Sequence, residues 1–240
     1  LLEGLAIEVD RQCHAREHVD DLMGERRGRH PERAPDSKRG HEPERHRFAV
    51  RETVEAALGF EGVAANSLDA ASDRVQFQEI GKTTMGAPFV YATISSPANL
   101  KNLEKYKQIN SKLADPRTFK STDTVAKKLI AEGKTIVLIT CGIHSTEVGG
   151  YLTSMLIAHK LASSNDPEVQ KILQNTIVLL VPSLNPDGVD IVKNWYDKTL
   201  GTPYEGTDPP ELYHKYTGHD DNRDWYAFTQ IETQITVHKI

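Results

Sequence analysis

Two uninterrupted runs of apolar, mostly β-branched residues place the strongest constraint on the fold. They cover residues 135–141 and 176–182. A strand that is apolar at every position is typical of a sheet whose two faces are both covered, as in parallel sheets flanked by helices. The intervening residues 147–162 and 167–173 have the length and composition expected of two helices. This order of strand, helices and strand predicts an α/β fold.

The residues before the first run predict an antiparallel hairpin at one edge of the sheet. Residues 75–80 alternate apolar and polar side chains, residues 81–86 are rich in turn-forming types, and residues 89–94 are rich in strand formers. Further helices are expected at residues 51–58, 67–71, 99–113, 124–132 and 226–240. We therefore expect a three-layer α/β fold in which a mixed sheet has helices on both faces.

The first 50 residues differ in composition from the rest of the chain. They hold nine of the thirteen arginines but one of the sixteen lysines, and residues 25–47 contain almost no large apolar side chains. Such a segment buries too little apolar surface to offset the entropy lost on ordering. We expect residues 1–50 to be disordered or foreign, and residues 51–240 to form the folded domain. Because the chain starts with Leu1 and shows no secretory signal, we expect its natural N-terminus to lie elsewhere.

Composition disfavours several classes of function. The formal net charge is −5, and acidic residues nearly balance the basic ones in the first 50 positions, so no nucleic-acid partner is expected. No apolar run approaches the roughly 20 residues that cross a bilayer, so no membrane span is expected. The two cysteines, Cys13 and Cys141, lie far apart and predict neither a disulfide framework nor a thiolate zinc site. A metal would have to be held by histidines and carboxylates.

Polar clusters follow both buried-strand runs, at the sheet edge where open α/β sheets bind their ligands. After residues 135–141, His144 and Glu147 lie three positions apart at the junction of the strand and a helix. This spacing places an imidazole nitrogen and a carboxylate on one side of a helical turn, where both can bind a single zinc ion. The alternative is a helix-dipole acid beside an ordinary loop histidine. The position in the sheet favours the metal site.

Two more polar clusters follow along the chain. Residues 185–188 read Asn-Pro-Asp-Gly, which is typical of a tight turn. Farther on, Asn222 and Arg223 are followed directly by Asp224 and Trp225. Arginine is scarce after residue 50, and a guanidinium fork beside an amide suits bidentate binding of a carboxylate. The alternative is a structural arginine paired with a neighbouring aspartate.

Two other patterns suggest different chemistry but are weakly supported. Residues 81–83 read Gly-Lys-Thr, but Gln76 stands where a phosphate-binding loop needs its upstream glycine. Cys141 and His144 could form a nucleophile pair, but Cys141 ends an apolar strand, where thiols are commonly inert.

Taken together, the ordered motifs resemble the zinc metallocarboxypeptidase family, the carboxypeptidase A-like peptidases. The matching segments are residues 142–147, 185–188 and 222–225, and the hairpin around residues 80–88 is similar to the family's entry strands. The resemblance implies the zinc-peptidase (phosphorylase/hydrolase-like) fold, with Zn²⁺ as cofactor and His144 and Glu147 as metal ligands. It implies that Asn222 and Arg223 bind the terminal carboxylate of the substrate.

The same resemblance implies hydrolysis of C-terminal peptide bonds by a metal-activated water. The expected partner is a peptide or acyl-amino-acid substrate with a free carboxylate. A secreted or periplasmic location is expected from the family, and we expect a monomer.

Part of the family's site is not found in the sequence. In the family, a third histidine ligand and a glutamate general base follow later in the chain. His238 lies in a helix-like context, and His214 and His219 come too early. We therefore expect the third ligand and the general base to lie beyond Ile240, and the catalytic domain to be truncated with an incomplete site.

Two alternatives remain open. Acyl-amino-acid deacylases related to the carboxypeptidases share the His-x-x-Glu and Asn-Arg pairs, although the hairpin and residues 185–188 favour the peptidase. The chain could also be a non-catalytic remnant that binds carboxylates. His214 and Lys215 are nearby cations for stabilising an oxyanion, and neither is assigned to that role.

Overall fold

The computed structural model describes residues 70–120, 122–211, 214–218 and 221–240. The N-terminal segment 1–50 and the helix expected at residues 51–58 lie outside these ranges, and so does most of the helix expected at residues 67–71. The domain boundary expected at residue 50 therefore stays a prediction.

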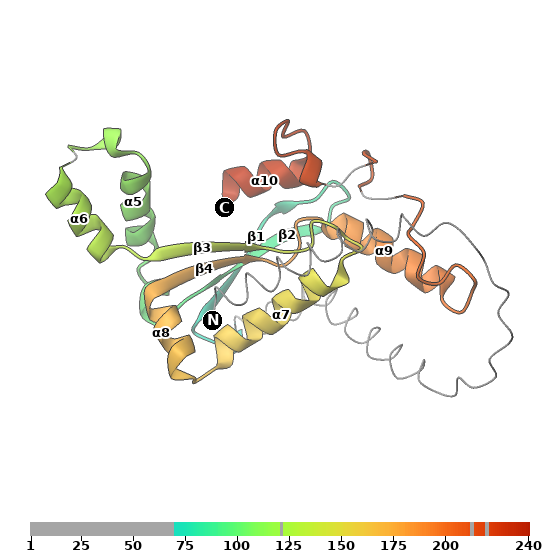
Figure 1. Cartoon of the computed structure of the whole chain (residues 1–240), viewed down its shortest axis with the longest axis horizontal. Helices are drawn as coiled ribbons and strands as arrows, with labels where there is room; N and C mark the ends of the chain where they lie inside the picture. The colour runs from blue at the N-terminus through green and yellow to red at the C-terminus, as the bar shows by residue number, and fades with distance from the viewer. Residues whose placement is uncertain (1–69, 121, 212–213, 219–220) are drawn as a thin grey trace, which may run out of the picture. The chain divides into compact units, whose positions relative to one another are not determined.

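A four-stranded mixed sheet forms the framework of the described chain (Figure 1). Its strands are β1 (Val75–Lys82), β2 (Pro88–Ile94), β3 (Thr135–Thr140) and β4 (Thr176–Val181), in the order β1-β2-β4-β3. β2 pairs antiparallel with both β1 and β4, whereas β3 pairs parallel with β4. The predicted mixed sheet with a hairpin at one edge is confirmed.

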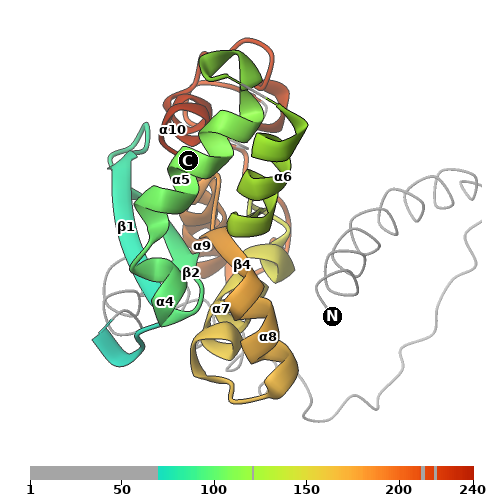
Figure 2. The same ribbon diagram turned by 90° about the vertical axis from the view of Figure 1, so that its left-hand side faces the viewer.

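Helices cover both faces of this sheet (Figures 1 and 2). On one face, α7 (Val148–Ser163) and α8 (Pro167–Asn175) bury side chains such as Ile157 and Leu173 against alternate residues of the strands. On the opposite face, Ile235 of α10 (Ile231–Lys239) packs in a second cluster of buried side chains. This arrangement confirms the three-layer α/β fold, since alternate strand residues feed two separate cores.

The remaining helical segments are shorter or peripheral. They are α4 (Pro97–Leu100), α5 (Leu103–Ala114), α6 (Asp123–Glu132) and α9 (Pro186–Thr199), with 3₁₀ turns η2 (Pro116–Thr118) and η3 (Asp221–Arg223). Among the described helices, none is both long enough and apolar enough to cross a membrane.

The helix predicted at residues 99–113 is in fact two helices. The buried Asn99 amide donates hydrogen bonds to the carbonyls of Leu173 and Gln174, at 2.9 and 3.1 Å. These bonds anchor α4 to the end of α8. The chain then turns at residues 101–102 before α5 begins.

Residues 185–188, which were predicted to form a tight turn, begin the helix α9. This helix was not predicted from the sequence. The Oδ1 atom of Asn185 accepts a hydrogen bond from the Gly188 N–H at 2.8 Å, and Pro186 occupies the first helical turn. An asparagine cap followed by proline is a common helix start. A Cβ at position 188 would lie 2.5 Å from the Asn185 Nδ2 atom, so the glycine permits this close approach.

β3 differs from the expectation of a strand buried on both faces. Ile136 is 39% exposed and Leu138 is 48% exposed, whereas Val178 in β4 is fully buried. β3 is an edge strand because, in the described part of the chain, only β4 pairs with it. The expectation holds for β4 and is wrong for β3.

Candidate functional site

The loops that follow β3 and β4 lie side by side. The Cys141 N–H donates to the Val181 carbonyl and the Leu184 N–H donates to the Cys141 carbonyl, so contact between the strands continues past their ends. Gly142 follows with φ at 62°, and a Cβ there would lie 3.0 Å from the Ser183 Oγ atom. Glycine allows both this backbone conformation and this approach. The chain therefore turns at Gly142, between the end of β3 and His144.

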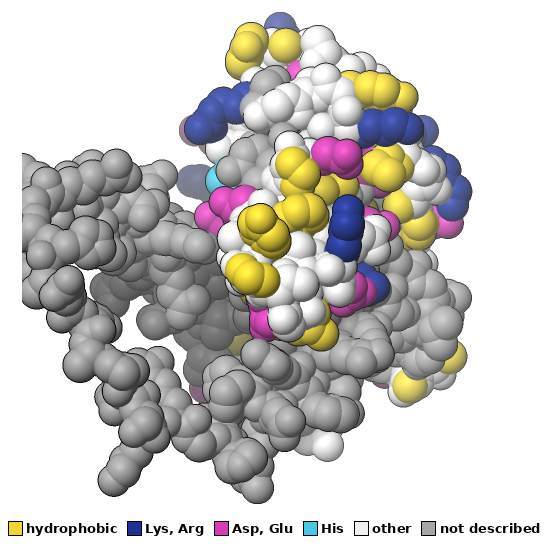
Figure 3. Space-filling model, turned by 90° about the vertical axis from the view of Figure 1, so that its right-hand side faces the viewer, with side chains coloured by type: hydrophobic (Ala, Val, Ile, Leu, Met, Phe, Trp, Pro, Cys, Tyr) yellow, Lys and Arg dark blue, Asp and Glu magenta, His cyan; other side chains and the backbone are white. Residues whose placement is uncertain are grey.

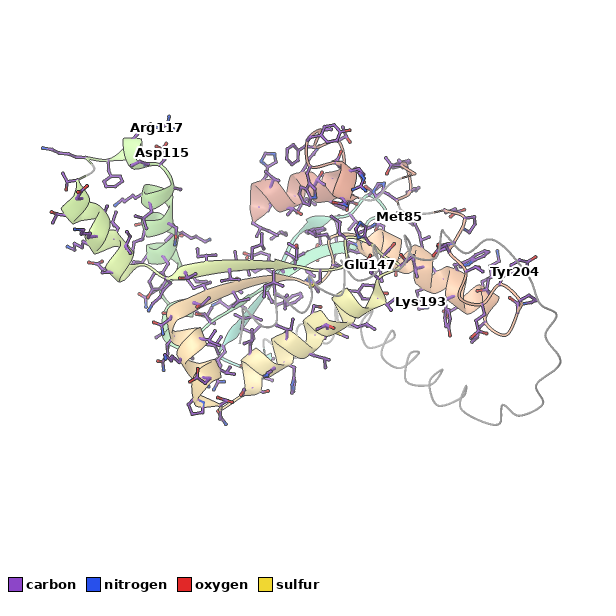
Figure 4. All side chains as sticks on the ribbon, viewed as in Figure 1. Met85, Asp115, Arg117, Glu147, Lys193 and Tyr204 are labelled. Atoms are coloured by element: carbon purple, nitrogen blue, oxygen red, sulfur yellow. The ribbon has the colours of Figure 1, made fainter. Side chains whose placement is uncertain are left out.

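His144 and Glu147 face each other across one turn of chain just before α7. The Glu147 N–H donates to the His144 carbonyl at 3.0 Å. The His144 Nδ1 atom lies 3.5 Å from the Glu147 Oε2 atom, and the two side chains are 35% and 38% exposed. Figure 4 shows Glu147 at the start of α7, where the polar loops gather. Both side chains are therefore open to a solute.

The distance between these two atoms fits two ligands of one zinc ion. Zinc binds histidine nitrogen and carboxylate oxygen at about 2.0–2.2 Å with tetrahedral geometry, which places two ligand atoms about 3.3–3.5 Å apart. The His144 and Glu147 atoms have this separation. The donor types and their spacing are thus suitable for zinc.

The 3₁₀ turn η3 brings the third sequence motif to the first. The Asn222 Nδ2 atom lies 3.2 Å from the His144 Nε2 atom, although 78 positions separate the two residues. Arg223 is the next residue on this turn and is exposed. The structure thus brings His144, Glu147 and Asn222 together. The contact of Asn222 with His144 was not predicted from the sequence.

Asp224 anchors the turn that carries Asn222 and Arg223. Its buried carboxylate accepts hydrogen bonds from the Thr229 and Gln230 N–H groups and from the hydroxyls of Thr229 and Thr233. Burial alone raises the pKa of Asp224, but these four hydrogen bonds outweigh it and lower the pKa to about 2. The anchor ties η3 to the start of α10.

A second group of metal-ligating types lies buried beneath the β1–β2 turn. One ligand atom from each of Asp187, His214 and Glu232 lies within 4.8 Å of the others. His214 Nε2 is 3.4 Å from Glu232 Oε2 and 3.0 Å from Thr84 Oγ1. From the sequence, His214 comes too early in the chain to be the third ligand, and neither Asp187 nor Glu232 was predicted as a site residue. The signal that the sequence offered for the two acids is their position, since each lies in the first turn of a helix.

The carboxylates of this buried group are already engaged by the β1–β2 turn. Asp187 accepts from the Thr83 hydroxyl at 2.6 Å and the Met85 N–H at 2.7 Å. Glu232 accepts from the Thr84 N–H at 2.7 Å and the Thr84 hydroxyl at 3.2 Å. Each acid also lies at a helix N-terminus, which stabilises negative charge. The group has the residue types that zinc accepts, but a cation would compete with these donors. His144 and Glu147 differ from this group in being partly exposed to solvent.

The two other chemical patterns in the sequence are explained by the fold. Burial raises the pKa of the Cys141 thiol to about 11, so at neutral pH it is protonated and a poor nucleophile. Gly81 and Lys82 end β1, and Thr83 donates to Asp187. Residues 81–83 therefore form a strand end and a turn. They do not precede a helix, as a phosphate-binding loop would.

The remaining histidines of the sequence reading lie elsewhere or outside the described residues. His238 is exposed near the end of α10. His219 falls outside the described ranges. On the face shown in Figure 3, hydrophobic, acidic and basic side chains of the described residues are interspersed.

Comparisons with known proteins identify the family of the chain. A model of the zinc carboxypeptidase family matches residues 63–237. No curated protein matches the chain. Among solved structures, the chain is similar to the metallo-carboxypeptidase from Burkholderia cenocepacia, with 18% identity over 76% of this chain and 35% of that chain and a TM-score of 0.45. It is also similar to the carboxypeptidase A from Helicoverpa armigera, with 18% identity over 61% of this chain and 28% of that chain and a TM-score of 0.34. The chain spans about a third of the length of these two proteins.

Proposed function

The chain belongs to the zinc carboxypeptidase family, and on that premise we propose that it supplies part of the active site of a metallocarboxypeptidase, which hydrolyses C-terminal peptide bonds. In this proposal His144 and Glu147 are two zinc ligands, and Asn222 and Arg223 bind the free carboxylate of a peptide. The family uses zinc as its cofactor.

The observation that carries the proposal is the 3.5 Å separation of His144 Nδ1 and Glu147 Oε2 at the carboxyl end of a parallel strand pair. When bound, zinc polarises a carbonyl and lowers the pKa of a bound water to about 7. A neutral histidine that uses Nδ1 as a ligand carries its proton on Nε2. The structure places the Asn222 Nδ2 atom 3.2 Å from Nε2. With the amide turned over, so that its oxygen faces the ring, Asn222 accepts a hydrogen bond from the Nε2–H group.

Arg223 contributes the charge that recognises a C-terminus. It is exposed on η3 next to Asn222, and Asp224 fixes that turn through four hydrogen bonds. A guanidinium can donate two parallel hydrogen bonds to one carboxylate, which gives orientation as well as affinity. A peptide held this way presents its last amide bond toward His144 and Glu147.

The proposal assigns two zinc ligands and assigns neither the third ligand nor the general base. In the described part of the chain, Asp187, His214 and Glu232 form the group of three residues close enough to share an ion. That group is the competing assignment for a zinc site.

Zinc titration of two variants separates the assignments. The His144→Ala variant should bind zinc at least about ten-fold more weakly than the wild-type chain, because even residues that only support a ligand commonly contribute that much. The dissociation constant is measured by isothermal titration calorimetry, in which zinc is added to the metal-free protein.

The matched control is His214→Gln, which changes the buried group and leaves His144 in place. Its zinc affinity should stay close to that of the wild type, because His214 neither binds the metal nor supports a ligand in this assignment. If zinc affinity falls in His214→Gln and does not fall in His144→Ala, zinc binds at the buried group of Asp187, His214 and Glu232, and the assignment to His144 is wrong. Circular dichroism confirms that each variant is folded.

A further inference from the structure

Two side chains on one face of α10 hold this helix against the hairpin. Glu232 and Ile235 lie three positions apart, which places them on the same side of a helix. Ile235 packs closely against β1, since a Cβ at Gly81 would lie 2.6 Å from the Ile235 Cδ1 atom. Glu232 accepts hydrogen bonds from the Thr84 N–H and hydroxyl. Apolar contact is non-directional, so the hydrogen bonds of Glu232 determine where along the hairpin the helix begins.

The Glu232 side chain is buried, so its partners determine its position. The residue is 1% exposed, and the His214 Nε2 atom lies 3.4 Å from its Oε2 atom. A buried carboxyl group needs hydrogen bonds in place of the water that it has lost. Glu232 therefore cannot leave the β1–β2 turn without losing these contacts, and the start of α10 stays with it.

The start of α10 also holds Asp224. The Asp224 carboxylate accepts hydrogen bonds from the Gln230 N–H and the Thr233 hydroxyl, which lie two positions before and one position after Glu232. Asp224 directly follows Arg223 in the chain. The first turn of α10 thus contacts both the hairpin and the segment that carries Arg223.

We propose that Glu232 is a positioning residue for the turn η3, which carries Asn222 and Arg223. Glu232 fixes the start of α10 on the hairpin, the start of α10 fixes Asp224, and Asp224 fixes the backbone of η3. The consequence for function rests on the proposed role of Arg223. A guanidinium must be correctly oriented to donate two parallel hydrogen bonds to one carboxylate, so a displaced turn weakens recognition of a free C-terminus.

Peptide binding to the full chain tests this consequence. Glu232→Ala should lower the ratio of the affinities for a peptide acid and its amide at least about five-fold, the low end of the effect of a lost hydrogen bond. Partial unfolding of the variant lowers both affinities alike and leaves the ratio unchanged. Glu232→Gln keeps an oxygen that can accept from the Thr84 N–H, so it should restore most of the ratio.

Glu168→Ala is the matched control for the binding measurement. Glu168 is the second residue of α8, as Glu232 is the second residue of α10, but it is exposed and lies on the opposite face of the sheet. Its removal should leave the ratio unchanged. If the wild type prefers the acid and Glu232→Ala keeps the full preference, the proposal is wrong.

Hydrogen exchange tests the positioning of the turn without reference to the peptide. The amides of Thr229 and Gln230 donate to Asp224 and should exchange at least about five-fold faster in Glu232→Ala. The amide of Val178, in the buried strand β4, is the internal reference and should be unaffected. Unchanged exchange at Thr229 and Gln230, or equal acceleration at Val178, would overturn the proposal. A wild-type chain that binds acid and amide equally would contradict the proposed role of Arg223, and the exchange result would still decide whether Glu232 positions the turn.

Discussion

Arg223 is the residue on which recognition of a C-terminus depends in the proposed site. It follows Asn222, whose amide lies against His144, on the exposed turn η3. Arginine keeps its charge at all relevant pH values and presents a planar fork of donors. The interaction therefore requires a charged carboxylate and is weak with an amide.

The Arg223→Ala variant should lose the preference for free C-termini. The wild-type chain is expected to bind a peptide acid at least about ten-fold more tightly than the same peptide amide, because a charged hydrogen bond contributes about 1.5–3 kcal/mol. The ratio should fall to near one in Arg223→Ala, as measured by isothermal titration calorimetry.

Arg117→Ala is the matched control for this measurement. Arg117 is an exposed arginine that pairs with Asp115 on the same surface loop, and Figure 4 shows both beside α5 and α6, at the end of the sheet away from Glu147. Its removal should leave the ratio unchanged. Equal affinity of the wild-type chain for the acid and the amide would rule out the assigned role of Arg223.

Asp224 is the residue that holds this turn, and its ionisation stabilises the fold. Its pKa in the folded chain is about 2, below the ordinary value of 3.8. A carboxyl whose pKa is lowered by folding stabilises the native state above the ordinary pKa. That contribution is lost as the pH falls from 3.8 toward 2.

Asp224→Asn should therefore remove a pH-dependent share of the stability. At pH 7 the free energy of unfolding should fall by about 2 kcal/mol, which corresponds to the lowered pKa. The difference between wild type and variant should shrink as the pH approaches 2. Urea unfolding between pH 2 and pH 7 measures both, and Asp123→Asn, at an exposed position, should show little effect. A difference that does not change with pH would contradict the assignment.

The β1–β2 turn shows how elements are connected around the site. Residues 83–85 donate to acids on two helices, Asp187 of α9 and Glu232 of α10. Glu232 also contacts His214, which precedes the Asn222 segment in the chain. One buried group thus connects the hairpin, α9 and α10 on the side of the sheet where η3 begins.

Removal of Glu232 should loosen this turn locally. Glu232→Ala leaves the Thr84 N–H without its acceptor at a partly buried position, a loss of about 1–3 kcal/mol. The amide hydrogen of Thr84 should then exchange at least about five-fold faster, as measured by hydrogen exchange, since that is the low end of this energy range.

Two variants serve as controls for the exchange measurement. Glu232→Gln keeps one oxygen that can accept from the Thr84 N–H, so it should restore most of the protection. Glu79→Ala removes an exposed acid of β1 and should have no effect on Thr84. Unchanged exchange in Glu232→Ala would show that the turn is held by other contacts.

The elements differ in how well their sequences predicted them. The hairpin and β4 followed from alternation and from a continuous apolar run, because these patterns reflect local geometry and burial. α9 was missed because Asn-Pro-Asp-Gly is equally suited to a turn and to a capped helix start. The exposure of β3 could not be read from its sequence, since β3 and β4 are almost identical in composition.

At the scale of the whole molecule, the order of the strands explains the position of the site. Placing β4 between β2 and β3 buries β4 on both sides and brings the ends of β3 and β4 together. The loop that carries His144 therefore lies beside the loop that follows β4, and η3 reaches the same place through the contact of Asn222 with His144.

The sequence by itself determined the fold class, the family resemblance and the identity of four candidate site residues. These depend on residue types, their spacing and the periodicity of apolar side chains, which act over a few positions. The tertiary structure alone decided that Asn222 lies against His144, that Asp187, His214 and Glu232 form one buried group, and that β3 is an edge strand. These contacts join residues far apart in the chain, and only the packing of helices and strands against one another determines which of them meet.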